Sequence, residues 1–218
     1  MQNLTFNSTT IIDDLAEKGY ALVDDFLPAD LITQLANEAS MRDAQGALQP
    51  AKTGLTGQLA NAEIRGDSIV WLAENDISFA IQTYFKQMYA LKNTFNEALF
   101  LNIQSFETHF SIYPISAKYG KHLDQFNAGN GLQARQISSI LYLNLHWQAN
   151  DGGELRLYLN DKNLNGENLQ TENYLDIQPI GGRLVLFKSA DFWHEVLACK
   201  AHRISLTGWF RSREIDVI

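Results

Sequence analysis

Two histidines, an aspartate and an arginine in the second half of the chain have the side-chain types that metal chemistry requires. His122 and Asp124 are separated by a single leucine, and His194 follows in a distant segment. Alternate side chains of an extended segment point to the same face, so His122 and Asp124 are expected to project together from one strand end. An imidazole arriving from His194 on another strand would complete a face of two imidazoles and one carboxylate.

This ligand set points to a particular class of metal site. Two imidazoles and one carboxylate leave open positions on a first-row metal, and they are the ligands of non-haem Fe(II) oxygenases.

A single histidine is weak evidence for a metal site, and His109, His146 and His202 are rival ligands. His202 should face away from Arg203 in an extended strand. His109 shares strand parity with Tyr113 and is expected to line the pocket without binding metal, whereas His146 is expected at the surface or in packing.

Arg203 adds a group suited to an anion. Its guanidinium offers a planar fork of donors that matches a carboxylate, and it shares strand parity with Thr207 and Trp209. A charged side chain among apolar strand residues is costly to bury without a partner. A carboxylate supplied by a bound molecule would satisfy it. The alternative is an ion pair with an internal carboxylate such as Asp191 or Glu154.

Tyrosines near these residues are candidates for lining the same pocket. Tyr142 lies in an apolar strand segment, where a buried phenol needs a hydrogen-bond partner. It either binds the same carboxylate as Arg203 or is a core tyrosine bonded to the backbone. Tyr113 and Tyr119 stand upstream of His122 and are further candidates.

Composition indicates a globular protein of one domain. The chain has 218 residues, 45% hydrophobic and 19% charged, and its net charge of -8 argues against a broad surface for nucleic acid or anionic membranes. It has no apolar run long enough to span a membrane and no signal-peptide pattern at its N-terminus. Cys199 is the only cysteine, which excludes an internal disulfide and indicates a reducing compartment. The expected location is the cytoplasm.

The elements that must position these residues begin with helices. Helical spacing predicts a short helix ending at Gly19, a second helix opening at Pro28, and a long helix over 79–100. A strand is expected over 20–23. Residues 41–67 have no clear period and predict a long loop with a short strand near 62–65. This loop either folds over a substrate or is an ordinary surface loop.

A period of two dominates the rest of the chain and predicts strands. They are expected over 105–113, 119–124, 137–144, 154–159, 175–177, 183–188, 194–196 and 204–211. Short strands after a helical preface favour an α+β, mainly β protein built on a double-layered antiparallel jelly roll, with the helices packed on one outer face. Within a single domain, residues 1–100 would give helical support and a substrate-side loop. Residues 101–218 would form the jelly-roll core.

Several segments, taken in order, resemble a known family. They are Tyr113-Pro114, Tyr119 through Asp124, Ile140 through Asn144, Gly152 through Arg156, His194-Glu195-Val196, and Arg203 through Trp209. Together they resemble the 2-oxoglutarate- and Fe(II)-dependent oxygenases. They are most similar to the prolyl 4-hydroxylases, especially the oxygen-sensing HIF prolyl hydroxylases and their bacterial relatives. The chain departs from the family at Gln125-Phe126-Asn127, where Asn-Pro is frequent, and in an unmatched polar insertion over 160–173.

The resemblance implies roles for individual residues and a double-stranded β-helix fold. His122, Asp124 and His194 would bind Fe2+ and, with Arg203, form the catalytic set. Arg203 would pair with the distal carboxylate of 2-oxoglutarate. The residues implied to bind the co-substrate, besides Arg203, are Tyr142, Tyr113 and Thr207. The residues implied to contact the substrate are Tyr119, Trp209, Arg135, Arg65 and Asp67.

The activity implied by the resemblance is hydroxylation of a prolyl residue in a peptide or protein. Fe2+, 2-oxoglutarate and O2 would be required, with L-ascorbate as an accessory, and succinate and CO2 would be released. Elongation factor Tu is a first candidate substrate because bacterial relatives act on it. The alternatives are the same chemistry on a small molecule or another residue, a cupin-like metal protein independent of 2-oxoglutarate, and a binding module with structural histidines.

Overall fold

The computed structural model describes residues 8–52, 61, 63–125, 135–159 and 173–212. Three of the sequence-based interpretations fall partly outside this range. They are the covering loop at 53–60 and 62, the family departure at 126–127, and most of the polar insertion at 160–172.

Three helices form in the places that the apolar spacing predicts. They are α1 (Ser8–Glu17), α2 (Ala29–Ala44) and α3 (Phe79–Leu99). Pro28 precedes the first turn of α2, where the missing N–H of proline costs nothing. Gly19 ends the first helical segment with a φ of 79°, and a side chain there would collide with Phe192.

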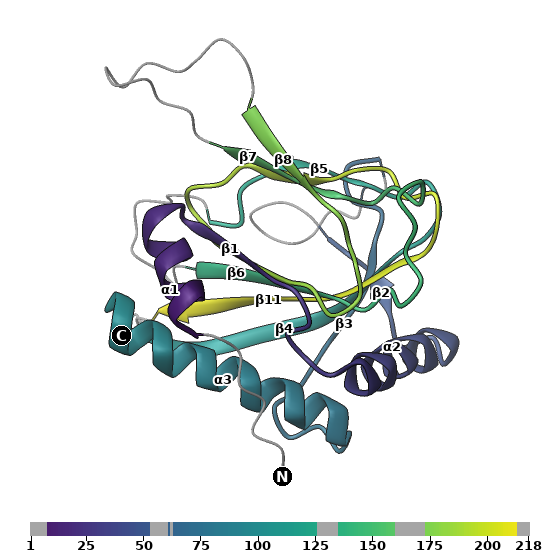
Figure 1. The fold of residues 1–218 in the computed structure, drawn as a ribbon. Coiled ribbons are helices and arrows are strands. Elements are labelled where there is room, and N and C mark those ends of the chain that lie inside the picture. Colours follow the sequence, from purple (N-terminus) through teal and green to yellow (C-terminus); the bar gives the residue numbers. More distant parts are fainter. Residues whose placement is uncertain (1–7, 53–60, 62, 126–134, 160–172, 213–218) are drawn as a thin grey trace, which may run out of the picture.

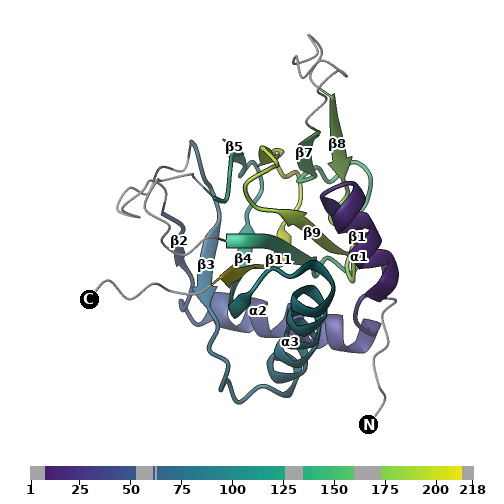
Figure 2. The same cartoon turned by 90° about the vertical axis from the view of Figure 1, so that its left-hand side faces the viewer.

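The strands form two antiparallel sheets over the described residues. The larger has the order β1-β9-β6-β11-β4-β3-β2, and the smaller has the order β5-β10-β7-β8. Their bounds are β1 Tyr20–Val23, β2 Gln49–Pro50, β3 Ser68–Trp71, β4 Ile103–Tyr113, β5 Tyr119–His122, β6 Arg135–Tyr142, β7 Leu155–Leu159, β8 Asn173–Ile177, β9 Leu184–Lys188, β10 His194–Val196 and β11 Arg203–Ser212. Figures 1 and 2 show the smaller sheet stacked above the larger one.

The prediction for the region between α2 and α3 was wrong in detail. No strand forms at the described residues of 62–65, where Arg65 makes only an isolated bridge with Tyr119. Instead, β3 pairs with β4, and β2 pairs with β3 at the edge of the larger sheet. β2 has two residues, and β3 has three apolar residues in a row, so neither shows an alternating period. The proline in β2 is tolerated because edge strands need fewer ladder hydrogen bonds.

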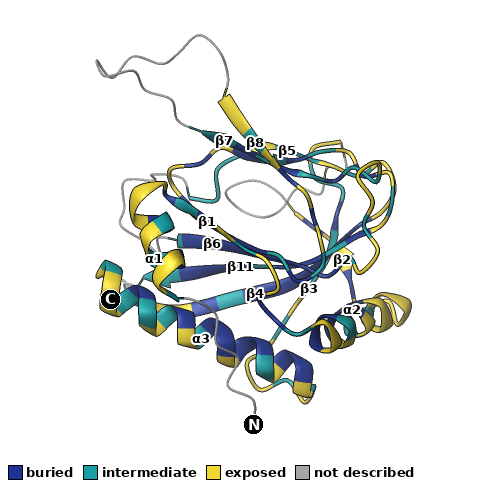
Figure 3. Ribbon diagram, viewed as in Figure 1, coloured by how far each residue is buried: buried dark blue, intermediate teal, exposed yellow. Residues whose placement is uncertain are grey.

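Alternate side chains of a strand point to opposite faces of the sheet. The buried apolar side chains accordingly form two clusters. The larger cluster lies between the helices and the larger sheet, and it contains Leu206 and Phe210 of β11 together with the buried faces of α2 and α3 (Figure 3). The opposite face of β11 carries Arg203 and Thr207 toward the space between the sheets. The helices therefore support one face of the sheet, as predicted, and leave the other face to form a site.

Candidate metal centre

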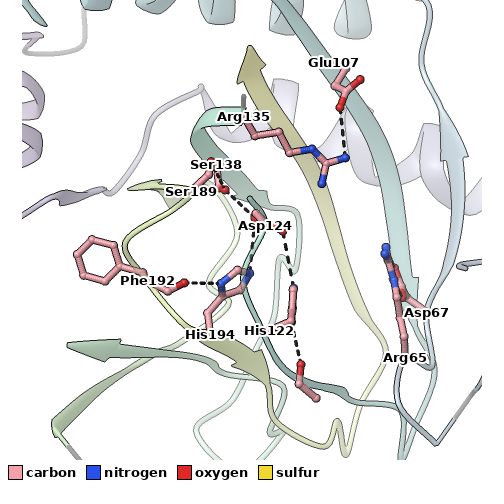
Figure 4. A network of polar contacts seen from close by, with 11 residues as sticks. Arg65, Asp67, Glu107, His122, Asp124, Arg135, Ser138, Ser189, Phe192 and His194 are labelled. Carbon is pink, nitrogen blue, oxygen red and sulfur yellow. Dashed lines mark hydrogen bonds and ion pairs between the residues drawn. The ribbon is translucent and has the colours of Figure 1, made fainter. Parts of the chain in front are cut away.

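The structure brings His122, Asp124 and His194 together. His122 ends β5 and stands directly opposite His194, the first residue of β10, so both imidazoles project from the same face. His122 Nε2 lies 3.7 Å from Asp124 Oδ1, and His194 Nε2 lies 3.6 Å from Asp124 Oδ2. One ligand atom from each residue lies within 4.8 Å of the other two. Figure 4 shows the three side chains converging.

Backbone carbonyls fix the tautomers of both imidazoles. His122 Nδ1 donates to the carbonyl of Gly120 at 2.8 Å, and His194 Nδ1 donates to the carbonyl of Phe192 at 3.0 Å. A carbonyl only accepts, so Nδ1 carries the proton in each ring. The lone pair of each Nε2 is thereby left for an ion, as in other histidine metal sites.

The electrostatics hold the groups in their ligand forms. Burial, together with the neighbouring His194, lowers the pKa of His122 to about 3. Burial alone would raise the pKa of Asp124, but the nearby His194 and His122 and the hydroxyl of Ser138 hold it at about 2. A neutral imidazole and an ionised carboxylate at neutral pH are the forms that bind a metal.

The donor set fits an iron ion. Ligands about 2.1 Å from an ion and at right angles to one another lie about 3 Å apart. His122 Nε2 and Asp124 Oδ1 are 3.7 Å apart, and one ligand atom from each residue lies within 4.8 Å of the others, so the set closes around an ion with small side-chain movements. Of the rival histidines, His109 is buried in the wall of the same pocket but does not belong to the ligand group, while His146 and His202 are exposed.

A cavity of about 1440 Å³ opens beside these ligands. Pockets for small ligands usually measure about 300–1,000 Å³, so this one has room for more than a small co-substrate. Among the residues singled out in the sequence, those that line it are Arg65, Asp67, His109, Tyr113, Tyr119, His122, Asp124, Arg135, His194, Arg203, Thr207 and Trp209. Tyr142 lies behind this wall, fully buried next to Arg203.

Arg203 is a buried cation without a carboxylate partner among the described residues. Its Nη1 donates to Ser205 Oγ at 3.3 Å, and its Nε has no hydrogen-bond partner in the described part of the chain. No described carboxylate, including Glu154, lies within ion-pair distance of it. The guanidinium carbon lies 4.9 Å from the ring centre of Tyr113 and 5.0 Å from that of Tyr142.

The hydroxyl of Tyr142 is also buried without a hydrogen-bond partner among the described residues. A buried phenol in this state is costly, and burial raises its pKa. The alternative of a core tyrosine bonded to the backbone is therefore not seen. An anion bound between Tyr142 and Arg203 would satisfy both groups.

A buried ion pair forms another part of the cavity wall. Arg65 Nε lies 2.7 Å from Asp67 Oδ1, and Ser111 Oγ donates to Asp67 Oδ2 at 2.8 Å. Arg65 also lies over the ring of Tyr119, at 4.7 Å. Tyr119 in turn stacks on His122, which connects this ion pair to the metal site.

Aromatic and cationic groups meet near Trp209. The guanidinium carbon of Arg135 lies 3.6 Å from the ring centre of Trp209, and Arg135 pairs with Glu107 at 3.3 Å. Trp71, which is half exposed, lies 6.2 Å from Trp209 and 4.9 Å from His109, measured between ring centres. The sequence did not single out Trp71, because its strand has three apolar residues in a row and no alternation.

Comparison with known proteins places the chain in a family. A model described as the 2OG-Fe(II) oxygenase superfamily matches residues 108–211. The crystal structure of a Pseudomonas putida prolyl-4-hydroxylase is 40% identical, with a TM-score of 0.80, and the match covers 94% of this chain and 99% of that one. This chain belongs to the prolyl 4-hydroxylase family of 2-oxoglutarate- and Fe(II)-dependent oxygenases. The resemblance read from the sequence and the predicted double-stranded β-helix are thereby confirmed.

Other members of the prolyl hydroxylase family are more distant. A Trichoplax adhaerens prolyl hydroxylase, in complex with a peptide fragment of hypoxia inducible factor, is 25% identical with a TM-score of 0.79, and the match covers 93% of this chain and 88% of that one. The Caenorhabditis elegans hypoxia-inducible factor prolyl hydroxylase is 29% identical over 96% of this chain, and human Egl nine homolog 1 is 27% identical over 92%. The chain spans 29% and 45% of the lengths of these two curated relatives.

None of the described helices is long and apolar enough to cross a membrane.

Proposed function

We propose that this oxygenase hydroxylates a prolyl residue in a peptide or protein. The observation that carries the proposal is the convergence of three ligand atoms within 4.8 Å on the wall of a cavity that also contains Arg203, which has no carboxylate partner among the described residues. When bound, Fe2+ and 2-oxoglutarate supply the oxidising chemistry that inserts oxygen from O2 into a C–H bond and leaves succinate and CO2. The protein places the reactants and keeps out water.

Each site residue has a defined task in this proposal. His122 and His194 hold the iron through Nε2, and Asp124 holds it through its carboxylate. Arg203 binds the distal carboxylate of 2-oxoglutarate with its fork of donors, and Tyr142 donates its hydroxyl to the same anion. Tyr113 and Thr207 line the space between this anion and the ion.

The substrate side of the cavity supports a peptide. Arg65, Tyr119, Arg135 and Trp209 are on its wall, and Asp67 holds Arg65 in place. The rings of Tyr119 and Trp209, which Arg65 and Arg135 partly cover, give this wall apolar edges that suit the ring of a proline. The cavity volume leaves space for a chain segment beside 2-oxoglutarate, and the solved structure of the Trichoplax adhaerens relative is a complex with a peptide fragment. The single cysteine, which is free and buried, supports a reducing compartment such as the cytoplasm.

The test is turnover of the iron-loaded enzyme with a cell lysate and with a panel of free amino acids, nucleobases and lipids. Mass spectrometry should find prolines that have gained one oxygen in a peptide or protein, with elongation factor Tu examined first, and succinate should appear in proportion. The His122→Ala variant should produce neither. Oxidation confined to small molecules would favour the alternative substrate class, and activity indifferent to 2-oxoglutarate would favour a cupin-like protein. L-Ascorbate is expected to prolong turnover.

A further inference from the structure

Two serine hydroxyls connect the turn between β9 and β10 to Asp124. Ser138 Oγ lies 2.6 Å from Asp124 Oδ2, and Ser189 Oγ lies 2.8 Å from Ser138 Oγ (Figure 4). A carboxylate only accepts hydrogen bonds, so the single hydroxyl proton of Ser138 goes to Asp124. Ser189 must then donate to Ser138, because a hydroxyl has only one proton to give. The chain of hydrogen bonds therefore runs in one direction, from Ser189 to the carboxylate.

The surroundings of the two serines keep this chain intact. Ser138 is 2% exposed and Ser189 is 0% exposed. Ser138 lies opposite both Trp209 and Phe187 in the larger sheet, and large side chains on the neighbouring strands cover it. Solvent does not compete for these hydroxyls, and hydrogen bonds in such a low-dielectric interior strengthen one another.

The backbone of Ser189 holds the same region from a second direction. Its N–H donates to the carbonyl of Gln136 at 3.1 Å, and its carbonyl accepts from the N–H of Gln125 at 3.3 Å. Gln125 directly follows Asp124 in the chain. The carbonyl of Phe192, three residues beyond Ser189, accepts from His194 Nδ1. One short turn, residues 189–192, therefore supports two of the three ligand residues.

We infer that Ser138, with Ser189 behind it, is a positioning residue that fixes the carboxylate of Asp124 for binding iron through one oxygen. The hydroxyl of Ser138 occupies Oδ2, and Oδ1 keeps its lone pairs for the ion. A carboxylate free to turn could bind through both oxygens and take a coordination position that 2-oxoglutarate or O2 needs. This inference rests on the metal site of the proposed function and not on the prolyl substrate.

The test is a titration of the metal-free 218-residue protein with Mn2+, without oxygen, 2-oxoglutarate or substrate. Ser138→Ala should weaken Mn2+ binding roughly 10- to 100-fold, the usual effect of removing a hydrogen-bond partner of a metal ligand. It should also weaken binding of 2-oxoglutarate at saturating Mn2+. Ser138→Thr, which keeps the hydroxyl, should restore most of the affinity. Ser189→Ala should have a smaller effect, and none when Ser138 is already alanine, because Ser189 acts through Ser138.

Ser139→Ala is the matched control. Ser139 is adjacent in the chain and also 0% exposed, but its hydroxyl reaches the carbonyl of Gly208 at 3.4 Å, on the opposite face of β6. Its replacement should leave Mn2+ affinity unchanged. Unchanged Mn2+ affinity of Ser138→Ala, or an equal loss in Ser139→Ala, overturns the inference and leaves the proposed function standing. A parent chain that binds no Mn2+ and no Fe2+ overturns both.

Discussion

The ring of Tyr119 lies flat against the imidazole of His122, with ring centres 3.7 Å apart and planes 20° apart. The guanidinium of Arg65 covers Tyr119 in turn, and Arg65 is held by Asp67. A buried ion pair, an aromatic ring and a candidate metal ligand thus form a continuous series of contacts. His122 is fixed by this stacking as well as by its hydrogen bond to the carbonyl of Gly120.

Replacing Tyr119 with leucine should therefore weaken metal binding without preventing folding. Aromatic pairs contribute about 0.5–1.5 kcal/mol beyond the area they bury, so metal affinity should fall about 2- to 10-fold. Tyr119→Phe keeps the ring and should bind metal like the parent. Mn2+ titrations of both variants give the comparison. Equal losses in the two variants would show that the hydroxyl, and not the stacked ring, supports His122.

Replacing Arg203 with alanine should act on 2-oxoglutarate and leave metal binding nearly intact. A buried charge pair broken from one side costs about 3–5 kcal/mol, which is roughly a hundredfold to a few-thousandfold in affinity. Arg203→Lys should recover only part of this loss, because a lysine cannot donate in a fork. The measurement is a 2-oxoglutarate titration of the Mn2+-loaded protein.

Arg183 provides the control for that experiment. It pairs with Asp24 at 2.6 Å on the surface, away from the cavity lining. Arg183→Ala should leave the affinity for 2-oxoglutarate unchanged. If Arg203→Ala binds 2-oxoglutarate as tightly as the parent, the carboxylate-binding role assigned to Arg203 is wrong.

His109 should make the stability of the apo-protein depend on pH. Burial, together with the nearby Arg65, lowers its pKa from 6.5 to about 4. The unfolded chain therefore binds a proton between these values that the folded chain does not. The free energy of unfolding should fall as the pH drops from about 6.5 to about 4, by on the order of 3 kcal/mol from this residue.

Thermal unfolding of metal-free His109→Gln across this pH range tests the assignment. Its stability should decline less steeply than that of the parent between pH 6.5 and 4. His202→Gln, at an exposed position, should show the same dependence of stability on pH as the parent. Identical slopes for the parent and His109→Gln would mean that His109 does not remain neutral in the folded protein.

The regular elements and the main residues of the site were accessible from the sequence because each left a periodic or compositional signal. The face of α3 and the parity of β11 predicted which side chains enter the core, and the order of His122, Asp124, His194 and Arg203 indicated the family. The short strands β2 and β3 left no such signal. The position of β3 depends on pairing with β4, a contact between segments distant in the sequence, and β2 in turn pairs with β3.

The positioning residue Ser138 could not be identified from the sequence, for a related reason. Ser138 shares the parity of Tyr142 on β6, and a serine on the pocket face of an apolar strand was the available signal. Its function depends on Asp124 and Ser189, which approach it only in the folded chain. The predicted roles of Tyr119, Arg135 and Trp209 toward a substrate remain predictions, since they need a bound peptide to test them.

Gly153 should be required for the position of Arg203. Its φ of 75° disfavours any other residue, and an added Cβ would lie 3.0 Å from Arg203 Cδ and 2.9 Å from Cys199 Sγ. Gly153→Ala should cost about 1 kcal/mol or more in stability from backbone strain. It should also weaken 2-oxoglutarate binding, because the guanidinium must shift. Calorimetric unfolding and 2-oxoglutarate titration of the Mn2+-loaded variant measure the two effects.

Gly46 provides a control that separates the effect of backbone strain from the effect of displacing Arg203. It has a similar φ of 71°, and an added Cβ there would meet nothing within 4 Å. Gly46→Ala should therefore lose a comparable amount of stability and keep the 2-oxoglutarate affinity of the parent. A loss of affinity in Gly153→Ala alone attributes the effect to contact with Arg203. Equal affinities in the two variants would show that Arg203 tolerates a side chain behind it, and that its position is set by Ser205 and the flanking tyrosines instead.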